Sequence, residues 1–317
     1  MKKYLCLLFI ILFSCNNHDE NKIAIVIHGG AGIILKENIS KSKEDSIINK
    51  LDEAISKGWE LLKKGESSEI AVIETIKILE DSPLFNAGKG SVFNNEGKVE
   101  NDASIMRGND LNAGASSGTS NVKNPITLAA NIMNHSEHVF LSGKGAENFA
   151  KNRYLEIVDN EYFHTKFRYN QLVNKQDDDK YGTVGCVAID GNGNIVAGTS
   201  TGGMTNKKWG RIGDSPIIGA GTYANNSTCG ISSTGSGEYF IRTVAAYQVS
   251  SLLENHNYDL KKAMYKVIHE KIGAIGGDGG MIGIDKNSNI SMEFNTPGMY
   301  RAYVNKYGEK EILLYQE

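Results

Sequence analysis

The sequence is poor in several features that define large classes of proteins. It contains only 4 prolines and no Pro/Ser tract, so no long rigid linker separates one part of the chain from another. Its 34 basic and 37 acidic residues leave a net charge of −3, which gives no electrostatic case for binding nucleic acid. No internal repeat is apparent. The composition is typical of globular proteins, and a chain of 317 residues can bury a sizeable core.

Signatures of nucleotide and metal sites are also missing. Three glycine-rich segments lack the spacing of a dinucleotide or phosphate loop, namely residues 29–32, 88–91 and 143–145. His135 and His138 lie three apart without a third ligand nearby, so we expect surface histidines. His28 has no metal-spaced partner, which favours a hydrogen-bonded structural histidine. We therefore expect no cofactor for catalysis.

Cysteine is scarce as well. Of 4 cysteines, only Cys186 and Cys229 fall in the part of the chain that we expect to fold. An exported protein could pair them, but two cysteines make a weak disulfide framework. We expect two free thiols, both mostly buried.

The apolar run near the N-terminus is too short to cross a membrane as a stable anchor. Lys2 and Lys3 precede it, residues 4–13 form it, and Ser14-Cys15 follow. The pattern is typical of a secretory signal, and its ending resembles a bacterial lipoprotein signal in which Cys15 is lipidated. We expect a signal peptide over 1–14, a polar tether over 15–21, and an exported lipoprotein anchored to a membrane in the periplasm or at the cell surface. Ordinary secretion with cleavage nearby is the alternative.

Apolar spacing in the first half of the chain predicts strands and helices in alternation. Continuous apolar runs indicate buried strands, and apolar residues three or four apart indicate helices with one face in the core. The expected elements are a strand at 22–28 ended by glycines at 29–32, and helices at 43–64 and 68–79, the second capped by Ser67 or Ser68. A strand at 99–106 and a small-residue loop at 108–118 follow. One further helix should start at Pro125, and another should cover 146–151. Residues 159–180 lack this periodicity, which predicts a solvated, flexible segment.

The second half begins with a strand pattern that opens on Thr183. Its two faces carry Val184, Cys186 and Ala188 on one side and Val187 and Ile189 on the other. The elements expected after it are a turn at 190–194 with a return strand at 195–200, helices at 237–253 and 259–272, a hairpin of 281–285 and 290–294, and strands at 300–304 and 312–315. Strands and helices in both halves predict an α/β fold with two sheets layered between helices.

Thr183 is a candidate nucleophile on chemical grounds. A neutral threonine hydroxyl needs an adjacent base to become a good nucleophile. If the Gly182–Thr183 bond broke, the freed α-amine would supply that base, since it titrates at about 7.7–8.0 whereas a lysine amine titrates at about 10.4. The same hydroxyl can first attack the Gly182 carbonyl, which has no side chain to block the approach. Alone, this stretch is also typical of an ordinary strand start. In the same way, Arg211 and Asp214 alone are typical of a surface ion pair.

An ordered set of short motifs indicates a family. The motifs are IHGGAG (27–32), PLFNAG (83–88), NP (124–125), TVG (183–185), GTSTGGM (198–204), GRIGDSP (210–216), STGSGE (233–238) and FNTPGMYR (294–301). This set resembles the plant-type L-asparaginases, also called isoaspartyl peptidases, which are threonine-type N-terminal nucleophile hydrolases. The resemblance covers nearly all of residues 22–305. It implies a four-layer αββα sandwich and an enzyme that hydrolyses β-aspartyl peptides and L-asparagine.

The resemblance also implies catalytic roles. Autocatalytic cleavage between Gly182 and Thr183 would expose Thr183 as the nucleophile. Thr201 would hydrogen-bond its hydroxyl. Thr234 and the Gly235 backbone N–H would form the oxyanion hole, which stabilises charge on the attacked carbonyl.

Substrate binding would follow from the residues around this centre. Arg211 would grip the substrate α-carboxylate with its bidentate fork, and Asp214 would pair with the α-ammonium. Gly235 and Gly237 would add backbone contacts, and Asn86 would be a supporting polar residue near the nucleophile. The expected substrate is therefore a small amino acid or a dipeptide.

Assembly follows from the same resemblance. Cleavage would give an α subunit (22–182, with a flexible tail at 159–182) and a β subunit (183–317), which together form one folded domain. Two processed protomers would pair as an (αβ)2 dimer. A structural sodium ion would bind to the backbone of Leu79, Glu80, Ser82, Phe85, Ala87 and Lys89.

Two other functions fit parts of this pattern. Glycosylasparaginase shares the threonine, the Arg-Asp pair and the Thr-Gly pair, but it resembles the first half less. A non-catalytic, lipid-anchored amino-acid-binding protein would keep Arg211 and Asp214 but could dispense with Thr183. The preference between L-asparagine and β-aspartyl peptides stays open.

Overall fold

The computed structural model describes residues 22–174 and 182–316, so the expected signal peptide, the tether and Cys15 lie outside the described residues. The helices are α1 (Lys41–Lys63), α2 (Ser68–Glu80), α3 (Pro125–His135), α4 (Gly143–Asn152), α5 (Lys166–Asn174), α6 (Gly237–Thr243), α7 (Ala245–His256) and α8 (Leu260–Tyr265). The strands are β1 (Ala24–Gly32), β2 (Asn101–Arg107), β3 (Ala113–Thr119), β4 (Phe140–Ser142), β5 (Val184–Ile189), β6 (Ile195–Thr201), β7 (Thr222–Ala224), β8 (Cys229–Gly235), β9 (Gly279–Asp285), β10 (Ile290–Phe294), β11 (Gly298–Val304) and β12 (Lys310–Tyr315).

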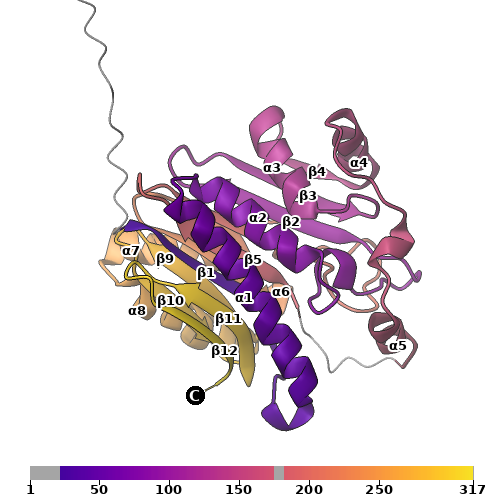
Figure 1. Cartoon of the computed structure of the whole chain (residues 1–317). Helices are drawn as coiled ribbons and strands as arrows, with labels where there is room; N and C mark the ends of the chain where they lie inside the picture. Colours follow the sequence, from indigo (N-terminus) through magenta and orange to yellow (C-terminus); the bar gives the residue numbers. More distant parts are fainter. Residues whose placement is uncertain (1–21, 175–181, 317) are drawn as a thin grey trace, which may run out of the picture.

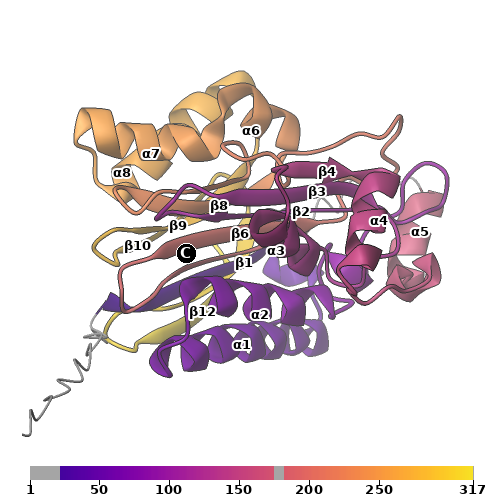
Figure 2. The ribbon, with the colours of Figure 1, turned by 90° about the horizontal axis from the view of Figure 1, so that it is seen from above.

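The strands form two sheets that stack face to face between helices (Figure 1). The larger sheet has the order β12-β11-β1-β5-β6-β2-β3-β4, and the smaller has the order β10-β9-β8-β7. Helices α1, α2 and α3 cover the outer face of the larger sheet, and α6, α7 and α8 cover that of the smaller one (Figure 2). The predicted four-layer αββα sandwich is confirmed.

Strand β5 shows how the sequence pattern produces these layers. Val184, Cys186 and Ala188 join the core beneath α1 and α2, whereas Val187 and Ile189 join the core between the two sheets. Successive side chains of a strand point to opposite faces, so one strand serves two cores. This division of β5 is the one that the alternation predicts.

The space between the two sheets changes from apolar to polar along the strands. On β6 the residues of this face are Ala197, then Thr199 and Thr201, and on β1 Val26 is followed by His28. All five are buried. Because a strand repeats every two residues, these polar side chains gather at one end of the inter-sheet space.

Residues 108–118 were expected to form a loop, which is wrong. Most of them belong to β3, which pairs antiparallel with β2 and parallel with β4. The small residues serve close packing, since a Cβ on Gly114 would collide with the Ala129 carbonyl oxygen and the Met133 nitrogen of α3. Small size at this place permits a helix to approach the sheet, and such a run cannot be told from a loop by composition.

Two expected boundaries also differ. The glycines at 29–32 do not end the first strand, because β11 continues to pair along it, with Gly30 opposite Tyr300. The helix expected at 237–253 is divided into α6 and α7 at Val244, which has a left-handed backbone with φ 49°. Apolar spacing is continuous across Val244, so it gives no sign of the break.

The segment expected to be solvated and flexible is ordered up to residue 174. It contains a short 3₁₀ turn, Asn160–Phe163, followed by α5. Phe163 is buried in a small cluster with Phe93, and Arg168 Nε donates to the Gly90 carbonyl oxygen at 2.8 Å. These few contacts hold the segment in place although it has no apolar repeat, so apolar periodicity does not predict its structure. Residues 175–181 lie outside the described residues.

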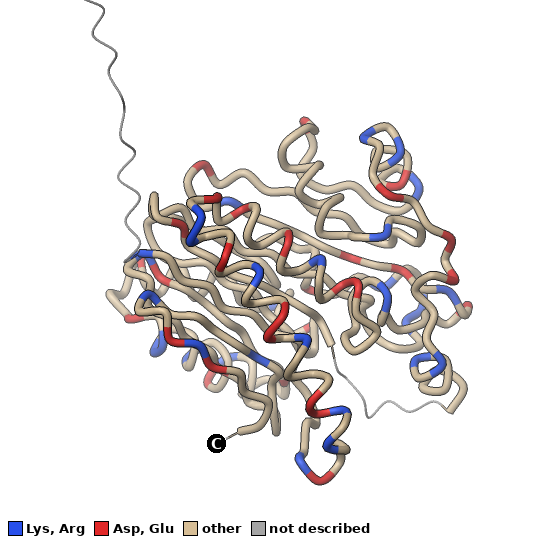
Figure 3. Tube along the Cα trace, in the orientation of Figure 1, with Lys and Arg blue, Asp and Glu red and all other residues tan. Residues whose placement is uncertain are grey.

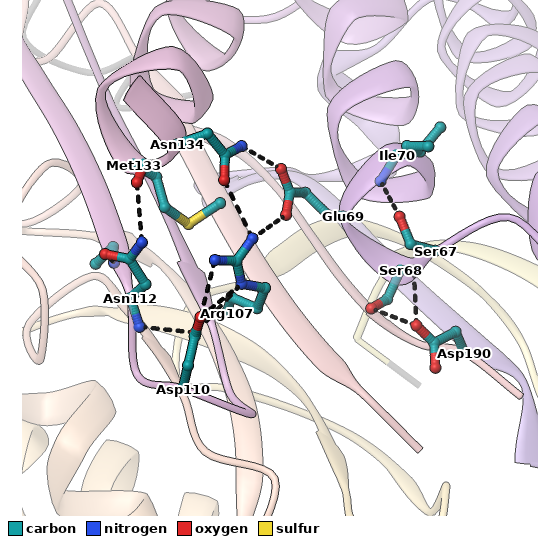
Figure 4. A network of polar contacts seen from close by, with 11 residues as sticks. Ser67, Ser68, Glu69, Ile70, Arg107, Asp110, Asn112, Met133, Asn134 and Asp190 are labelled. Carbon is teal, nitrogen blue, oxygen red and sulfur yellow. Dashed lines mark hydrogen bonds and ion pairs between the residues drawn. The ribbon is translucent and has the colours of Figure 1, made fainter. Parts of the chain in front are cut away.

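Polar contacts fasten the helices to the larger sheet (Figure 4). Asp190, at the end of β5, accepts hydrogen bonds from the backbone N–H and the hydroxyl of Ser68 at 3.1 and 3.2 Å. Arg107 on β2 donates to Glu69 of α2 at 2.8 Å and to Asn134 of α3 at 3.1 Å. Helix α2 is thereby fixed across the sheet that carries the candidate nucleophile.

Acidic and basic residues are interspersed along α1 (Figure 3). His135 and His138 are exposed, as predicted. Within residues 22–174 and 182–316, no helix combines the length and apolar character needed to span a bilayer.

Both cysteines of the described chain are free and buried, as predicted. Cys186 lies in the core beneath α2, and Cys229 lies in the core beneath α7 and α8. Burial raises the pKa of each thiol.

Candidate active site

A cavity of about 400 Å³ lies at the polar end of the inter-sheet space. Its lining includes most of the residues that the sequence predicts for the site, namely Asn86, Gly182, Thr183, Thr201, Arg211, Asp214, Thr234 and Gly235. The lining is completed by Val92, Gly203, Met204, Thr205, Gly213, Ser215 and Ser236. Gly237 stands just behind it, where a Cβ would lie 2.8 Å from Asp214 Oδ1.

Thr183 immediately precedes β5, and its hydroxyl points to the neighbouring strand. Thr183 Oγ1 donates to Thr201 Oγ1 at 3.1 Å. Thr201 Oγ1 also accepts from the backbone N–H of Gly203 at 3.0 Å. Because Thr201 ends β6, the pairing of β5 with β6 sets the separation of the two hydroxyls.

Gly182 is held in surroundings that only a glycine tolerates. Its φ is 140°, and a Cβ at this position would collide with Asn86. Its carbonyl oxygen accepts a hydrogen bond from the backbone N–H of Asn86 at 3.0 Å. On the other side lies Gly30, with φ 112°, where a Cβ would be 2.6 Å from the Gly182 nitrogen. Two segments of the first half therefore enclose the peptide unit that precedes Thr183.

Asn86 is itself tied to the residues around the cavity. Its Nδ2 donates to the Gly203 carbonyl at 2.7 Å, and its Oδ1 accepts from the Val92 N–H at 2.9 Å. Its carbonyl oxygen accepts from the Gly202 N–H at 3.0 Å. These bonds fix the backbone N–H of Asn86 opposite the Gly182 carbonyl.

Arg211 and Asp214 lie together on the cavity wall. Arg211 donates from Nε and Nη2 to the two carboxylate oxygens of Glu238, both at 2.9 Å. Burial raises the pKa of Asp214 to about 7, against its own backbone hydrogen bond and the nearby Arg211 charge. Among the described residues, Asp214 Oδ2 has no hydrogen-bond partner. The sequence did not predict the role of Glu238, although a carboxylate within the 233–238 motif was a signal for an arginine partner.

Thr234 and Gly235 end β8 and complete the wall opposite the larger sheet. Thr234 is buried, and its hydroxyl accepts from the Ala31 N–H of β1 at 3.4 Å. The predicted oxyanion-hole pair is thus next to Thr183 in space, although β8 belongs to the smaller sheet.

His28 is hydrogen-bonded, as predicted, but one of its partners was not foreseen. Its Nδ1 lies 3.0 Å from the Thr183 carbonyl oxygen, and its Nε2 lies 3.0 Å from Ser232 Oγ. Burial lowers the pKa of His28 to about 3, against the bond to Thr183. One sequence signal could have indicated this position: side chains two apart on a strand share a face, so His28 lies on the same face of β1 as Val26.

The loop between α2 and β2 folds back on itself beside the site. Gly88 packs against the Glu80 carbonyl oxygen so closely that a Cβ would collide with it. The Glu80 side chain accepts from Ser200 Oγ at 2.6 Å, and burial raises its pKa to about 8. The sodium ion that the resemblance implies at this loop stays a prediction.

The chain is similar to known proteins along most of its length. Residues 21–314 match the model of the asparaginase family. The chain is 45% identical over 327 residues to a putative isoaspartyl peptidase/L-asparaginase of Dictyostelium discoideum, covering 90% of this chain and 94% of that protein. It is 45% identical over 297 residues to the isoaspartyl peptidase of Escherichia coli (strain K12), with coverage of 89% and 92%.

A third relative is archaeal. The plant-type L-asparaginase of Pyrococcus furiosus is 41% identical over 310 residues, covering 91% of this chain and 98% of that protein. The matched residues contain both sheets, apart from the last residue of β12, and every residue that lines the cavity. The chain therefore belongs to the asparaginase family and is a hydrolase.

Proposed function

We propose that this protein is an isoaspartyl peptidase and L-asparaginase that activates itself by breaking its Gly182–Thr183 bond. The observation that carries the proposal is the Thr183 hydroxyl, 3.1 Å from Thr201 in a cavity that Arg211 and Asp214 also line. The names of the relatives point to the same two activities. Catalysis needs no cofactor.

Self-cleavage begins with attack of Thr183 Oγ on the Gly182 carbonyl carbon. The Asn86 N–H, 3.0 Å from the carbonyl oxygen, stabilises the negative charge that develops there. The C–N bond then breaks, the Thr183 nitrogen takes the hydroxyl proton to become an amine, and Gly182 remains as an ester on Oγ. Water hydrolyses the ester, which leaves a Gly182 carboxylate and restores the Thr183 hydroxyl.

Hydrolysis of the substrate uses the freed amine. The Thr183 amine accepts the hydroxyl proton while Oγ attacks the β-carbonyl of an L-aspartyl group. Thr234 and the Gly235 N–H stabilise the oxyanion, and Thr201 orients the attacking hydroxyl. The leaving nitrogen takes the proton from the ammonium, and a β-aspartyl ester remains on Thr183. Water, activated by the same amine, then releases L-aspartate.

Arg211 and Asp214 recognise the two charges of the α-amino-acid group. Glu238 holds the Arg211 fork from one side, which leaves the other donors for the substrate α-carboxylate. Asp214 Oδ2, which has no partner among the described residues, accepts from the α-ammonium. Gly237 admits the substrate close to both, since any side chain there would press on Asp214 and Arg211.

The cavity is large enough for more than asparagine. A volume of about 400 Å³ lies in the range of pockets that bury whole small-molecule ligands. Val92 and Met204 give the lining an apolar part, and Asn86 and Thr205 give it polar groups. These residues supply room and contacts for the leaving residue of a β-aspartyl dipeptide.

A denaturing gel tests the proposal. The purified protein should separate into two fragments that end at Gly182 and begin at Thr183, because the enclosed glycine and the adjacent hydroxyl favour cleavage there. The same preparation should release ammonia from L-asparagine and L-aspartate from a β-aspartyl dipeptide. An uncut chain that releases neither product would refute the proposal.

The cut chain would remain one folded unit. Strand β5, which follows the cut, pairs with β1 on one side and β6 on the other, so the two subunits share the larger sheet. We propose that two processed protomers then form an (αβ)2 dimer. A structural sodium ion would be held by the backbone carbonyls of Leu79, Glu80, Ser82, Phe85, Ala87 and Lys89.

We also propose that the protein is exported and carries a lipid on Cys15. The support is the basic start, short apolar run and Ser14-Cys15 ending of the first fifteen residues. A Cys15→Ala variant should lose labelling by a fatty acid and move from the membrane to the soluble fraction. A Ser14→Ala variant keeps the cysteine and should stay labelled. Equal fractionation of Cys15→Ala and the wild type would contradict lipid anchoring.

A further inference from the structure

A continuous run of buried polar side chains joins the candidate nucleophile to the smaller sheet. At its head, His28 Nδ1 contacts the Thr183 carbonyl oxygen, and His28 Nε2 contacts Ser232 Oγ, both at 3.0 Å. His28 comes from β1 and Ser232 from β8, so the contact crosses the space between the sheets. Neither side chain has measurable exposure to solvent.

The run continues through three more hydroxyls. Ser232 Oγ lies 2.7 Å from Thr199 Oγ1, which accepts from Thr222 Oγ1 at 2.6 Å. Thr222 Oγ1 accepts from Ser104 Oγ at 2.8 Å, and Ser104 Oγ is also 2.6 Å from the Ser215 carbonyl oxygen. Ser215 follows Asp214 directly, so the run links the nucleophile to the wall that binds the substrate.

The carbonyl of Thr183 fixes the state of the imidazole. A carbonyl oxygen can only accept, so Nδ1 must carry the proton and donate it to Thr183. In a neutral imidazole Nε2 is then an acceptor, and Ser232 must donate to it. Among residues 22–174 and 182–316, no carboxylate is hydrogen-bonded to the ring, and burial lowers the pKa of His28 to about 3, so the imidazole is neutral.

The order of the hydroxyl donors follows from His28. Ser232 has one proton, which goes to Nε2, so Thr199 donates to Ser232 at 2.7 Å and Thr222 donates to Thr199 at 2.6 Å. Ser104 shares its single proton between Thr222 at 2.8 Å and the Ser215 carbonyl oxygen at 2.6 Å. A protonated His28 would donate from Nε2 as well, and the hydroxyls of Ser232, Thr199 and Thr222 would have to turn round.

We propose that His28 is a positioning residue for the nucleophile, with its neutral Nδ1–H tautomer donating to the Thr183 carbonyl oxygen and accepting from Ser232. The inference rests on the proposed function. Cleavage of the Gly182–Thr183 bond removes the covalent hold on the nitrogen side of Thr183. The bond from His28 holds the carbonyl side, which is unaffected by the cut, and hydrogen bonds in one direction along a buried run strengthen one another.

Nuclear magnetic resonance of the histidine ring nitrogens tests the tautomer directly. The signal of His28, assigned by its loss in a His28→Gln variant, should be that of the neutral Nδ1–H form throughout pH 5 to pH 8. An Nε2–H tautomer, or a ring that becomes protonated within this range, would overturn the proposal. The tautomer itself is read on the wild-type protein, and the variant serves only to assign the signal.

A matched pair of variants tests the positioning role. Ser232→Ala removes the donor to His28, while Ser250→Ala removes an equally buried hydroxyl that contacts Thr228 at 2.6 Å, away from the cavity. Ser232→Ala should lower kcat about tenfold per cleaved molecule, the effect of one lost hydrogen bond, with KM within about twofold. Ser250→Ala should keep the wild-type kcat, with a similar loss of thermal stability.

The outcomes separate this inference from the proposed function. If the wild type and Ser250→Ala neither cut nor hydrolyse, the proposed function fails, and the positioning role falls with it. If both are active and Ser232→Ala matches them in kcat, the positioning role alone fails. A raised KM with an unchanged kcat in Ser232→Ala would also contradict the positioning role.

Discussion

A Thr183→Ala variant should remain a single uncut chain and should lose hydrolysis of both L-asparagine and β-aspartyl dipeptides. A methyl group cannot attack the Gly182 carbonyl, so no amine is freed and no base forms beside the site. Removal of a catalytic nucleophile lowers kcat by roughly a millionfold in a well-studied hydrolase. We therefore expect activity at the background rate. The measurements are a denaturing gel and an assay for ammonia and L-aspartate.

The matched control is Thr183→Ser, which keeps the hydroxyl. It should still cut itself and should hydrolyse substrate, although the missing methyl leaves the side chain freer to rotate. The hydrogen bond from Asn86 to Gly182 joins backbone atoms, so the substitution does not affect it. The contact with Thr201 uses the Thr183 hydroxyl, which serine also has. Cleavage of Thr183→Ala at Gly182, or an uncut Thr183→Ser, would show that another group attacks the bond.

Arg211→Gln should separate self-cleavage from hydrolysis. Arg211 lies on the substrate side of the cavity with Glu238, whereas the contacts to Gly182 come from Asn86 and Gly30. The variant should cut itself as fast as the wild type. Its kcat/KM for L-asparagine should fall by roughly two to three orders of magnitude, because the α-carboxylate loses its cation. Gel time courses and steady-state kinetics measure the two effects.

Lys208→Gln is the control for this variant. Lys208 lies three residues away on the same segment, carries the same charge and is exposed. It should leave both self-cleavage and kcat/KM unchanged. A similar loss of kcat/KM in Lys208→Gln would attribute the effect to net charge, and a wild-type kcat/KM in Arg211→Gln would remove Arg211 from substrate binding.

Much of this architecture can be predicted from the sequence because it depends on local periodicity. The alternation of β5 assigns Cys186 to one core and Val187 to the other, and the structure agrees. The candidate site could be named in advance because short motifs in a fixed order carry it. Thr183, Thr201 and Thr234 come from different strands, yet all three line one cavity.

The remaining features depend on contacts between distant segments, which no local pattern encodes. The bond between His28 and Thr183 joins β1 to the start of β5, and Arg211 meets Glu238, which lies in the first turn of α6. Phe163 becomes buried through a few contacts made at long range. The small residues near Gly114 predict a loop, although they form a strand, because close packing against a helix and a short turn select the same amino acids.

The most direct test is mass spectrometry of the C-terminal fragment after acid quenching of a reaction with a β-aspartyl dipeptide. The first peptide of that fragment should begin at Thr183 and should carry the added mass of a β-aspartyl group in a fraction of the molecules. A peptide that runs unbroken through Gly182, or an aspartyl adduct on a residue other than Thr183, would contradict the account.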